Sequence, residues 1–264
     1  HNPSTMSMTA STPRTALSET SVAKVLTEIE STECAYNLDL AVLCDDLFPA
    51  FASVDKAASY SVFANVHILR GINQELLSAL QGQDGPPLDL AGRLERVAVA
   101  FSTIAPYLRG YATFCTAAVM AQERLSSLRA GSASLDAAVA AVEQITGQSA
   151  GSWLIKPVQR LCKYPLLLGA LVADVPPSLP GPHASLVAAH DAIRLVVDDV
   201  NQRVRAAEER EGLLVLAEAL KMRDLVTPTR SLLASTRVIK MIETHTSTVM
   251  PIEGDLMRLP PPGP

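Results

Sequence analysis

Residues 153–168 read WLIKPVQRLCKYPLLL, and this stretch decides how the whole chain is interpreted. Its apolar positions recur at helical spacing, which predicts a buried face. That face would consist of Leu154, Val158, Leu161, Cys162 and Pro165. Polar side chains at steps of three, four and seven form a second face: Lys156, Gln159, Arg160 and Lys163. On spacing alone, the second face is the solvated basic side of a core helix.

Two prolines and a run of leucines lead to further expectations about this helix. Proline inside a helix removes a hydrogen bond, so Pro157 is expected near the first turn and Pro165 at a kink. Leu166 and Leu167 follow in the most apolar run of the chain. We therefore expect both leucines to be core residues.

The composition around this stretch favours helices throughout. Of the 264 residues, 48% are hydrophobic but only 4% are aromatic. Most of the apolar residues are Ala, Leu and Val. Ala and Leu favour helix, and Val is tolerated inside packed helices. The length suits one sizeable domain with flanking segments, or two small domains.

Charge argues against two classes of partner. The chain has 22 basic and 27 acidic residues, a formal net charge of −5. Nucleic-acid binding normally requires a basic surface to neutralise phosphates, so the sequence predicts no nucleic-acid partner. It also contains no polybasic cluster of the kind that binds anionic lipid.

The four cysteines are predicted to be reduced core residues. Cys34, Cys44, Cys115 and Cys162 form no CxxC pair and have no histidine at metal-ligand spacing. A free cysteine in an apolar helix behaves as a small hydrophobic residue. Together with the lack of a signal-peptide pattern at the start, this predicts a cytoplasmic protein without a metal site.

Helical patterns follow one another along the chain. The first runs from about Ser21 to near Pro49, and further patterns cover about 54–80, 88–109, 111–128, 134–145 and 152–175. The longest extends from about Ala184 past Arg210. Six or seven helices with short connections predict an all-α fold, an elongated helical bundle.

Both ends of the chain differ from this helical part. Residues 1–18 are rich in Ser, Thr and Pro and are expected to form a disordered leader. Residues 225–241 mix β-branched residues with Ser, Thr and Pro and are expected to contain one or two strands. The chain ends in MRLPPPGP, a polyproline-like segment.

The sequence lacks the familiar enzymatic motifs. GxSxG, HExxH, GxGxxG and the phosphate-binding GxxxxGK[ST] are all absent. The five histidines are scattered and are interpreted as surface or packed side chains. We therefore expect neither a cofactor nor covalent chemistry carried out by the chain itself.

Residues 154–168 resemble the signature helix of the Dbl-homology (RhoGEF) family, L-[IL]-K-P-x-Q-R-[IL]-x-[KR]-Y-P-L-L-L. A second family block, V-[IL]-x-E-L-x-x-T-E-x-x-Y-x-x-D-L, resembles VLTEIESTECAYNLDL at 25–40. The family also has an Asn after an apolar residue in its last long helix, and Val200-Asn201 lies 38 positions after Lys163. The resemblance covers roughly residues 20–212.

The resemblance implies a guanine-nucleotide exchange factor for Rho-family small GTPases. In such a domain, Glu28 would contact switch I, while Lys163 and Asn201 would hold switch II. Gln159 belongs to the same motif. Ile155 matches a family position that touches the GTPase between its switches, and Ile there favours Rac-like partners. Without the resemblance, Glu28 would be an ordinary surface partner of Lys24, and Asn201 an exposed amide.

The resemblance also implies a domain organisation: a leader over 1–18, a Dbl-homology domain over 19–212, and a linker over 213–264 that begins a truncated pleckstrin-homology domain. A complete second domain would recruit the protein to the plasma membrane or cytoskeleton. Two alternatives stay open. One is a Dbl-homology scaffold without exchange activity, and the other is an adaptor that acts through the tail.

Overall fold

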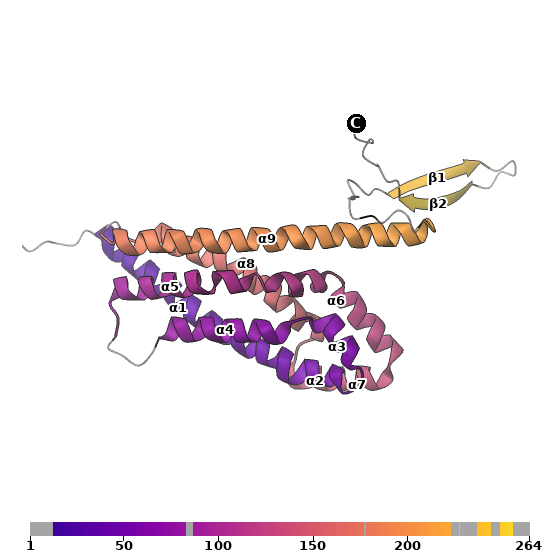
Figure 1. The fold of residues 1–264 in the computed structure, drawn as a ribbon, viewed down its shortest axis with the longest axis horizontal. Helices are drawn as coiled ribbons and strands as arrows, with labels where there is room; N and C mark the ends of the chain where they lie inside the picture. Colours follow the sequence, from indigo (N-terminus) through magenta and orange to yellow (C-terminus); the bar gives the residue numbers. More distant parts are fainter. Residues whose placement is uncertain are drawn as a thin grey trace, which may run out of the picture. The chain divides into compact units, whose positions relative to one another are not determined.

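The computed structural model describes residues 13–82, 87–176, 178–222, 227, 237–243 and 249–255. The chain forms two compact units, His1–Asn201 and Gln202–Pro264. Every regular element in the described part of the first unit is a helix (Figure 1), which confirms the predicted all-α bundle. The helices in chain order are α1 (Pro13–Ala41), the π-helix η1 (Val42–Leu47), α2 (Phe48–Ala52), α3 (Lys56–Phe63), α4 (Val66–Gln81), α5 (Leu90–Leu108), α6 (Tyr111–Gly131), α7 (Ala133–Thr146), α8 (Ala150–Asp174) and α9 (Pro180–Ala219).

The first helix differs from the prediction at both ends. It begins at Pro13, so the expected disordered leader is wrong for residues 13–18, while residues 1–12 lie outside the described part. Proline suits the first helical position because its fixed φ matches the helix and its missing N–H would be unpaired there. Beyond Ala41 the backbone widens into the π-helix η1 and then continues as α2, which places Pro49 in the first turn of α2.

Side-chain caps mark where several helices begin. Asp55, Asp89, Ser132 and Ser149 each accept a hydrogen bond from a backbone N–H in the first turn of α3, α5, α7 and α8, respectively. At the other end of α7, Gly147 has a φ of 69°, a left-handed conformation that suits glycine at a helix end. The prediction had placed the start of this helix at Ser134, because the cap at Ser132 was not recognised.

The core of the first unit lies between α1, α4, α5, α6 and α8. α1 packs against α8 and α4, α4 packs against α5, and α6 packs against α3 and α8. Large aromatic side chains fill the space between the helices: Phe51, Phe63, Phe101, Tyr111, Phe114 and Tyr164. Such side chains bury large apolar areas, so a few of them dominate the packing of a core otherwise rich in Ala, Leu and Val.

α8 is one continuous helix through both of its prolines. It begins at Ala150, so Pro157 lies two turns inside the helix instead of in its first turn. The core face contains Leu154, Leu161, Leu168 and Leu171, at steps of seven or three. Leu166 points away from this face and is 72% exposed, so the expectation that it is a core residue is wrong.

The last part of the chain contains a helix end and a hairpin. α9 extends to Ala219, past the predicted domain end at 212, and the boundary between the two units falls within it. Strands β1 (Arg237–Glu243) and β2 (Val249–Asp255) pair antiparallel, with Lys240 opposite Ile252. The prediction of strands is thus correct for β1, whereas β2 was not foreseen. No helix among the described residues is long and apolar enough to cross a membrane.

The two neighbouring leucines of α8 allow a test of the packing. Leu168 is fully buried, so Leu168→Ala should lower the free energy of unfolding by about 2–5 kcal/mol. Leu166→Ala removes an exposed side chain and should change it by less than about 0.5 kcal/mol. Chemical denaturation of both variants measures the difference. Equal losses would mean that the helix face is assigned wrongly.

Candidate functional site

The side chains predicted to form the site are all exposed. Glu28 lies on α1, whereas Ile155, Gln159 and Lys163 lie on α8 and Asn201 lies on α9. Ile155 is 45% exposed, so this apolar side chain reaches the surface. These positions are observations, whereas the roles of the five residues in nucleotide exchange stay predictions.

Contacts at both ends of α1 and α8 show that the two helices run antiparallel. Near the start of α1, the Ser21 hydroxyl donates a hydrogen bond to Asp174 at the end of α8. Near the end of α1, Asp39 pairs with Lys156 at 2.7 Å, close to the start of α8. The register of the pair is therefore fixed along most of its length.

Glu28 and Lys163 lie near each other along this pair. Between the two end contacts, Nη1 of Arg160 donates to the Thr32 hydroxyl at 2.9 Å. Glu28 precedes Thr32 by four residues, and Lys163 follows Arg160 by three. In antiparallel helices these steps lead in the same direction, so both side chains lie about one turn from the same contact.

Asn201 comes from the helix on the other side of α8. Gly169 of α8 faces His190 of α9, because a Cβ atom at Gly169 would lie 3.5 Å from Nε2 of His190. Asn201 follows His190 by 11 residues, about three helical turns, so it lies on the same side of α9. α8 thus lies between the helices that carry Glu28 and Asn201.

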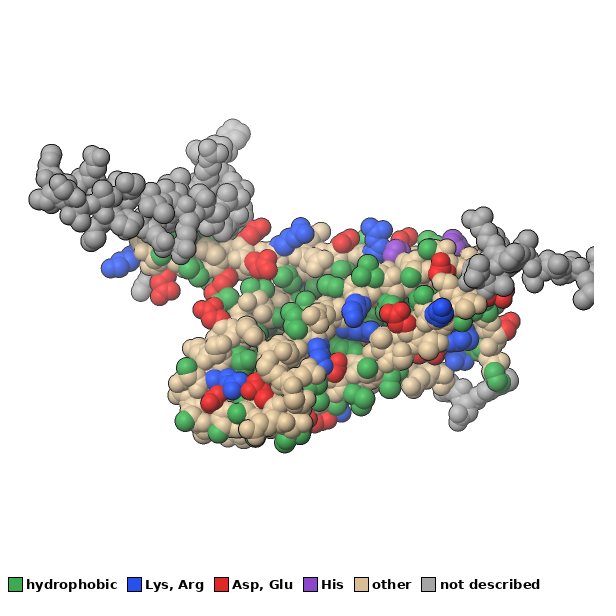
Figure 2. Space-filling view, turned by 180° about the vertical axis from the view of Figure 1, so that it is seen from behind, with side chains coloured by type: hydrophobic (Ala, Val, Ile, Leu, Met, Phe, Trp, Pro, Cys, Tyr) green, Lys and Arg blue, Asp and Glu red, His purple; other side chains and the backbone are tan. Residues whose placement is uncertain are grey.

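Charges on the exposed surface are mixed. The face seen from behind in Figure 2, below α9, shows basic and acidic side chains scattered among apolar ones. Neither sign gathers into a large patch among the described residues of this face.

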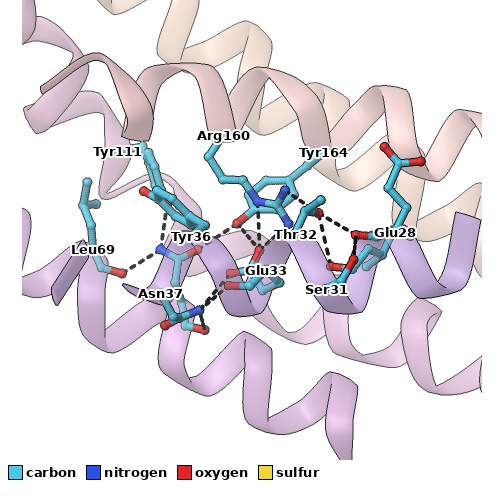
Figure 3. Close-up of polar contacts among 12 residues, drawn as sticks. Glu28, Ser31, Thr32, Glu33, Tyr36, Asn37, Leu69, Tyr111, Arg160 and Tyr164 are labelled. Carbon is cyan, nitrogen blue, oxygen red and sulfur yellow. Dashed lines mark hydrogen bonds and ion pairs between the residues drawn. The ribbon is translucent and has the colours of Figure 1, made fainter. Parts of the chain in front are cut away.

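Two charged side chains meet in the core beneath the exposed residues (Figure 3). Glu33 of α1 is 0% exposed and Arg160 of α8 is 5% exposed. Oε2 of Glu33 accepts hydrogen bonds from Nη2 and Nε of Arg160 at 2.7 and 3.0 Å, and from the Tyr164 hydroxyl at 3.0 Å. Burial raises the pKa of the Glu33 carboxyl, and the Arg160 guanidinium opposes that rise.

Hydroxyl and amide groups extend this network to two more helices. The Tyr164 hydroxyl lies 2.8 Å from Oδ1 of Asn73 on α4, whose Nδ2 donates to the Tyr111 hydroxyl of α6 at 2.6 Å. Tyr111 in turn shares a hydrogen bond of 3.0 Å with the Tyr36 hydroxyl of α1. Burial raises the pKa values of Tyr36, Tyr111 and Tyr164, so all three stay protonated at neutral pH.

The structure corrects several interpretations of the motif. Arg160 is buried and not part of a solvated basic face. Lys156 is half-buried, because it pairs with Asp39 and its Nζ lies 3.6 Å from the centre of the Trp153 ring. Cys162 is exposed, as is Cys34, so the prediction that all four cysteines are core residues holds only for Cys44 and Cys115.

The buried pair could have been predicted from spacing. Glu33 follows Leu26 and Ile29 and precedes Leu40 at steps of three, four or seven, so it lies on the core face of its helix. Arg160 lies in the same way between Trp153, seven residues before it, and Tyr164, four residues after it. A buried charge requires a partner of opposite sign, so one acid and one base on two core faces predict a pair.

The first turn of α8 is held by a separate ion pair. Oε1 of Glu143 accepts a hydrogen bond from the Ala150 backbone N–H at 2.8 Å and one from Nη1 of Arg129 at 2.9 Å. Burial raises the pKa of Glu143, but the Ala150 amide and Arg129 outweigh it, so the pKa is lowered overall. Glu143 therefore fixes the start of the helix that carries Ile155, Gln159 and Lys163.

Comparison with known proteins agrees with this arrangement. The RhoGEF domain family matches residues 25–201. A curated relative, the RhoGEF domain-containing protein gxcJ of Dictyostelium discoideum, is 28% identical over 207 residues. That alignment covers 76% of this chain but only 17% of the relative.

Solved structures share the fold. The DH/PH domains of p115-RhoGEF (R399E mutant) give a TM-score of 0.72 at 19% identity, over 91% of this chain and 75% of that chain. The PDZ-RhoGEF DH/PH domains, solved in complex with GTP-gamma-S activated RhoA, also give 0.72 at 20% identity, over 94% and 74% of the two chains.

The lowered pKa of Glu143 predicts a pH-dependent contribution to stability. A carboxyl whose folded pKa is lowered stabilises the fold above its unfolded pKa, and this contribution is lost as pH falls through the folded pKa. Glu143→Gln should thus cost roughly 0.5–1 kcal/mol at pH 7 and progressively less as the pH is lowered from 7 through the folded pKa into acid. Thermal melts of Glu143→Gln and of the exposed control Glu123→Gln across this range test it. A gap that persists in acid would exclude the ion pair as its cause.

Proposed function

Because this chain belongs to the RhoGEF domain family, we propose that it is a guanine-nucleotide exchange factor for a Rho-family small GTPase. One observation carries the proposal. Glu28, Lys163 and Asn201 are exposed on three adjoining helices, and the resemblance read from the sequence assigns nucleotide exchange to these three residues. The solved complex of a related DH/PH fragment with RhoA supports a partner of this class.

The proposed mechanism is selective binding of one state of the GTPase. The domain would bind the nucleotide-free form more tightly than the loaded form, which favours nucleotide release without covalent chemistry. The coupling is reciprocal, so returning nucleotide weakens the complex by the same factor. A thousandfold faster release requires only about 4 kcal/mol off the barrier, which a few contacts can provide.

Each exposed side chain has a chemistry suited to its proposed task. The Glu28 carboxylate accepts hydrogen bonds from a backbone amide and a hydroxyl together, as needed to draw switch I from the nucleotide. Lys163 provides a charged donor and Asn201 a donor and an acceptor for switch II. Gln159 lies one turn before Lys163 on the exposed side of α8 and would extend the same contact.

Partner choice is proposed to depend on the region of Ile155. A cavity of about 410 Å³ lies beside it, between α6 and the start of α8. Its wall is made mostly of small or polar side chains: Ala118, Ala121, Gln122, Ser149, Gly151, Ser152 and Leu154. The cavity could accept a side chain of the GTPase, which would then contact the apolar Ile155 at its edge. By the family resemblance, an isoleucine at this position favours a Rac-like partner. Specificity is nevertheless a difference of affinities over several contacts.

The proposal extends to organisation and location. Residues 19–212 would be the exchange domain, and 213–264 a linker and the beginning of a pleckstrin-homology domain that recruits the protein to a membrane or the cytoskeleton. The chain spans only 17% of the length of the relative named above, so any further domains of the native protein would add to this activity. The four cysteines are free, which suits the cytoplasm.

Release of a fluorescent nucleotide from a panel of Rho-family GTPases tests the function. Wild type should accelerate release from at least one of them, with a Rac-like GTPase responding most. Glu28→Ala and Lys163→Ala should each slow that release at least about tenfold, or ~1.4 kcal/mol, because each removes a contact made in the nucleotide-free complex.

The controls are matched in charge and exposure. Glu123→Ala on α6 and Lys56→Ala on α3 remove an exposed acid and an exposed base that are not among the proposed contact residues, and should leave release unchanged. All four variants should keep the wild-type helicity and melting temperature. A chain that folds normally but accelerates none of the panel would instead be a scaffold.

A further inference from the structure

A single hydroxyl joins the two sides of the proposed exchange site. Oγ1 of Thr32 lies 2.9 Å from Nη1 of Arg160 on α8 and 2.6 Å from the backbone carbonyl oxygen of Glu28 on α1. Figure 3 shows this chain of contacts from Arg160 through Thr32 to the main chain of Glu28. The carbonyl belongs to the same residue whose carboxylate is proposed to act on switch I.

The chemistry of the two partners determines which group donates and which accepts in each hydrogen bond of Thr32. Arg160 is a donor only, so the hydroxyl oxygen accepts from it. The carbonyl of Glu28 is an acceptor only, so the one hydroxyl proton is donated to it. The Thr32 oxygen therefore accepts from Arg160 while its proton goes to the Glu28 carbonyl, which at 2.6 Å is nearer than the Ile29 carbonyl at 3.4 Å.

The Arg160 side chain is itself held in place, so it can fix the position of Thr32. Its Nε and Nη2 donate to Glu33, and its guanidinium lies 5.0 Å from the centre of the Tyr164 ring. Such a charge-assisted pair with two donors fixes the plane of the guanidinium. Nη1 is thus presented to Thr32 in one orientation.

The bridge formed by the Thr32 hydroxyl, from Arg160 to the Glu28 carbonyl, also lies close to Lys163. Arg160 precedes Lys163 by three residues on α8, so the two share one helical turn. The bridge therefore connects the turn that carries Lys163 to the turn that carries Glu28. Binding sites perform well when supporting hydrogen bonds hold their contact residues in place, since small displacements cost much of the rate.

We propose that Thr32 is a positioning residue, which through Arg160 fixes the Glu28 turn relative to Lys163. The inference rests on the proposed exchange function and deepens it. Thr32 does not touch the GTPase in this account. Its hydroxyl sets where the Glu28 carboxylate stands when switch I arrives.

Thr32→Val removes the hydroxyl while keeping the shape of the side chain. We expect it to lower the maximal rate of nucleotide release about five- to tenfold, with a smaller change in the GTPase concentration needed for half-maximal rate. Thr32→Ser restores the hydroxyl and should restore the rate. Thr27→Val is the matched control, because the Thr27 hydroxyl makes the same bond to the carbonyl four residues back but is exposed.

Repeating Thr32→Val in the Glu28→Gln variant shows whether Thr32 acts by positioning Glu28 or by stabilising the fold as a whole. In Glu28→Gln the carboxylate is already lost, so Thr32→Val should slow the remaining release little further, because the two changes act through one group. If Thr32→Val slows release by the same factor in both backgrounds, the bridge acts on the fold as a whole and the inference is overturned. Unchanged release by Thr32→Val in the wild-type background also overturns it, while leaving the exchange function intact.

A distance measurement tests the geometry without any GTPase. Cys34 on α1 and Cys162 on α8 are exposed, whereas Cys44 and Cys115 are buried and burial raises their pKa values to about 11 and about 12. Nitroxide labels should therefore react selectively with the exposed pair at neutral pH.

Dipolar electron-spin resonance then reports the spacing of the two helices. Thr32→Val should broaden or shift the distance distribution relative to wild type, and Thr27→Val should not. A distribution that is identical in all three proteins would show that the hydroxyl does not fix the helices. If wild type accelerates no GTPase, the proposed function fails, while this measurement still decides whether the bridge exists.

Discussion

The buried ion pair between Glu33 and Arg160 is the constraint on which the site depends. Removing two charges from water costs several kcal/mol for each, and good geometry with further hydrogen bonds is needed to offset that cost. Both conditions are met here, since Arg160 donates twice to Oε2 of Glu33 and the Tyr164 hydroxyl donates to the same oxygen. Any other register of α1 against α8 would leave two charges buried without partners.

A pair of this kind contributes more to uniqueness than to stability. Apolar side chains of similar size would pack at least as well, but they would tolerate sliding of one helix along the other. The polar network instead connects α1, α4, α6 and α8 through Tyr36, Asn73 and Tyr111. The exposed residues of α1 and α8 gain a fixed spacing from this network, which the proposed contact with two separate switches would require.

Helical periodicity predicted the fold class and the exposure of Glu28, whereas the site itself was predicted from the family resemblance. Leu26, Ile29 and Leu40 repeat at helical spacing, and Glu28 falls between them on the polar side. The prediction was wrong where the type of a residue was given more weight than its position around the helix. Arg160 was placed in solvent because it is charged, and Leu166 in the core because it is apolar, yet the periodicity of α8 indicates the opposite for both. The proposed role of Thr32 could not be predicted, because it depends on a contact with Arg160, which lies 128 positions away in the sequence.

A double-mutant cycle between Glu33→Leu and Arg160→Met tests the central claim most directly. Each single change should lower the free energy of unfolding by about 3–5 kcal/mol, because it strands one buried charge, while the double variant should recover most of that loss. The recovered double variant should nevertheless accelerate nucleotide release more slowly than wild type, since its helices are no longer held in one register. Additive losses in stability, or a stable double variant with full exchange activity, would contradict the account.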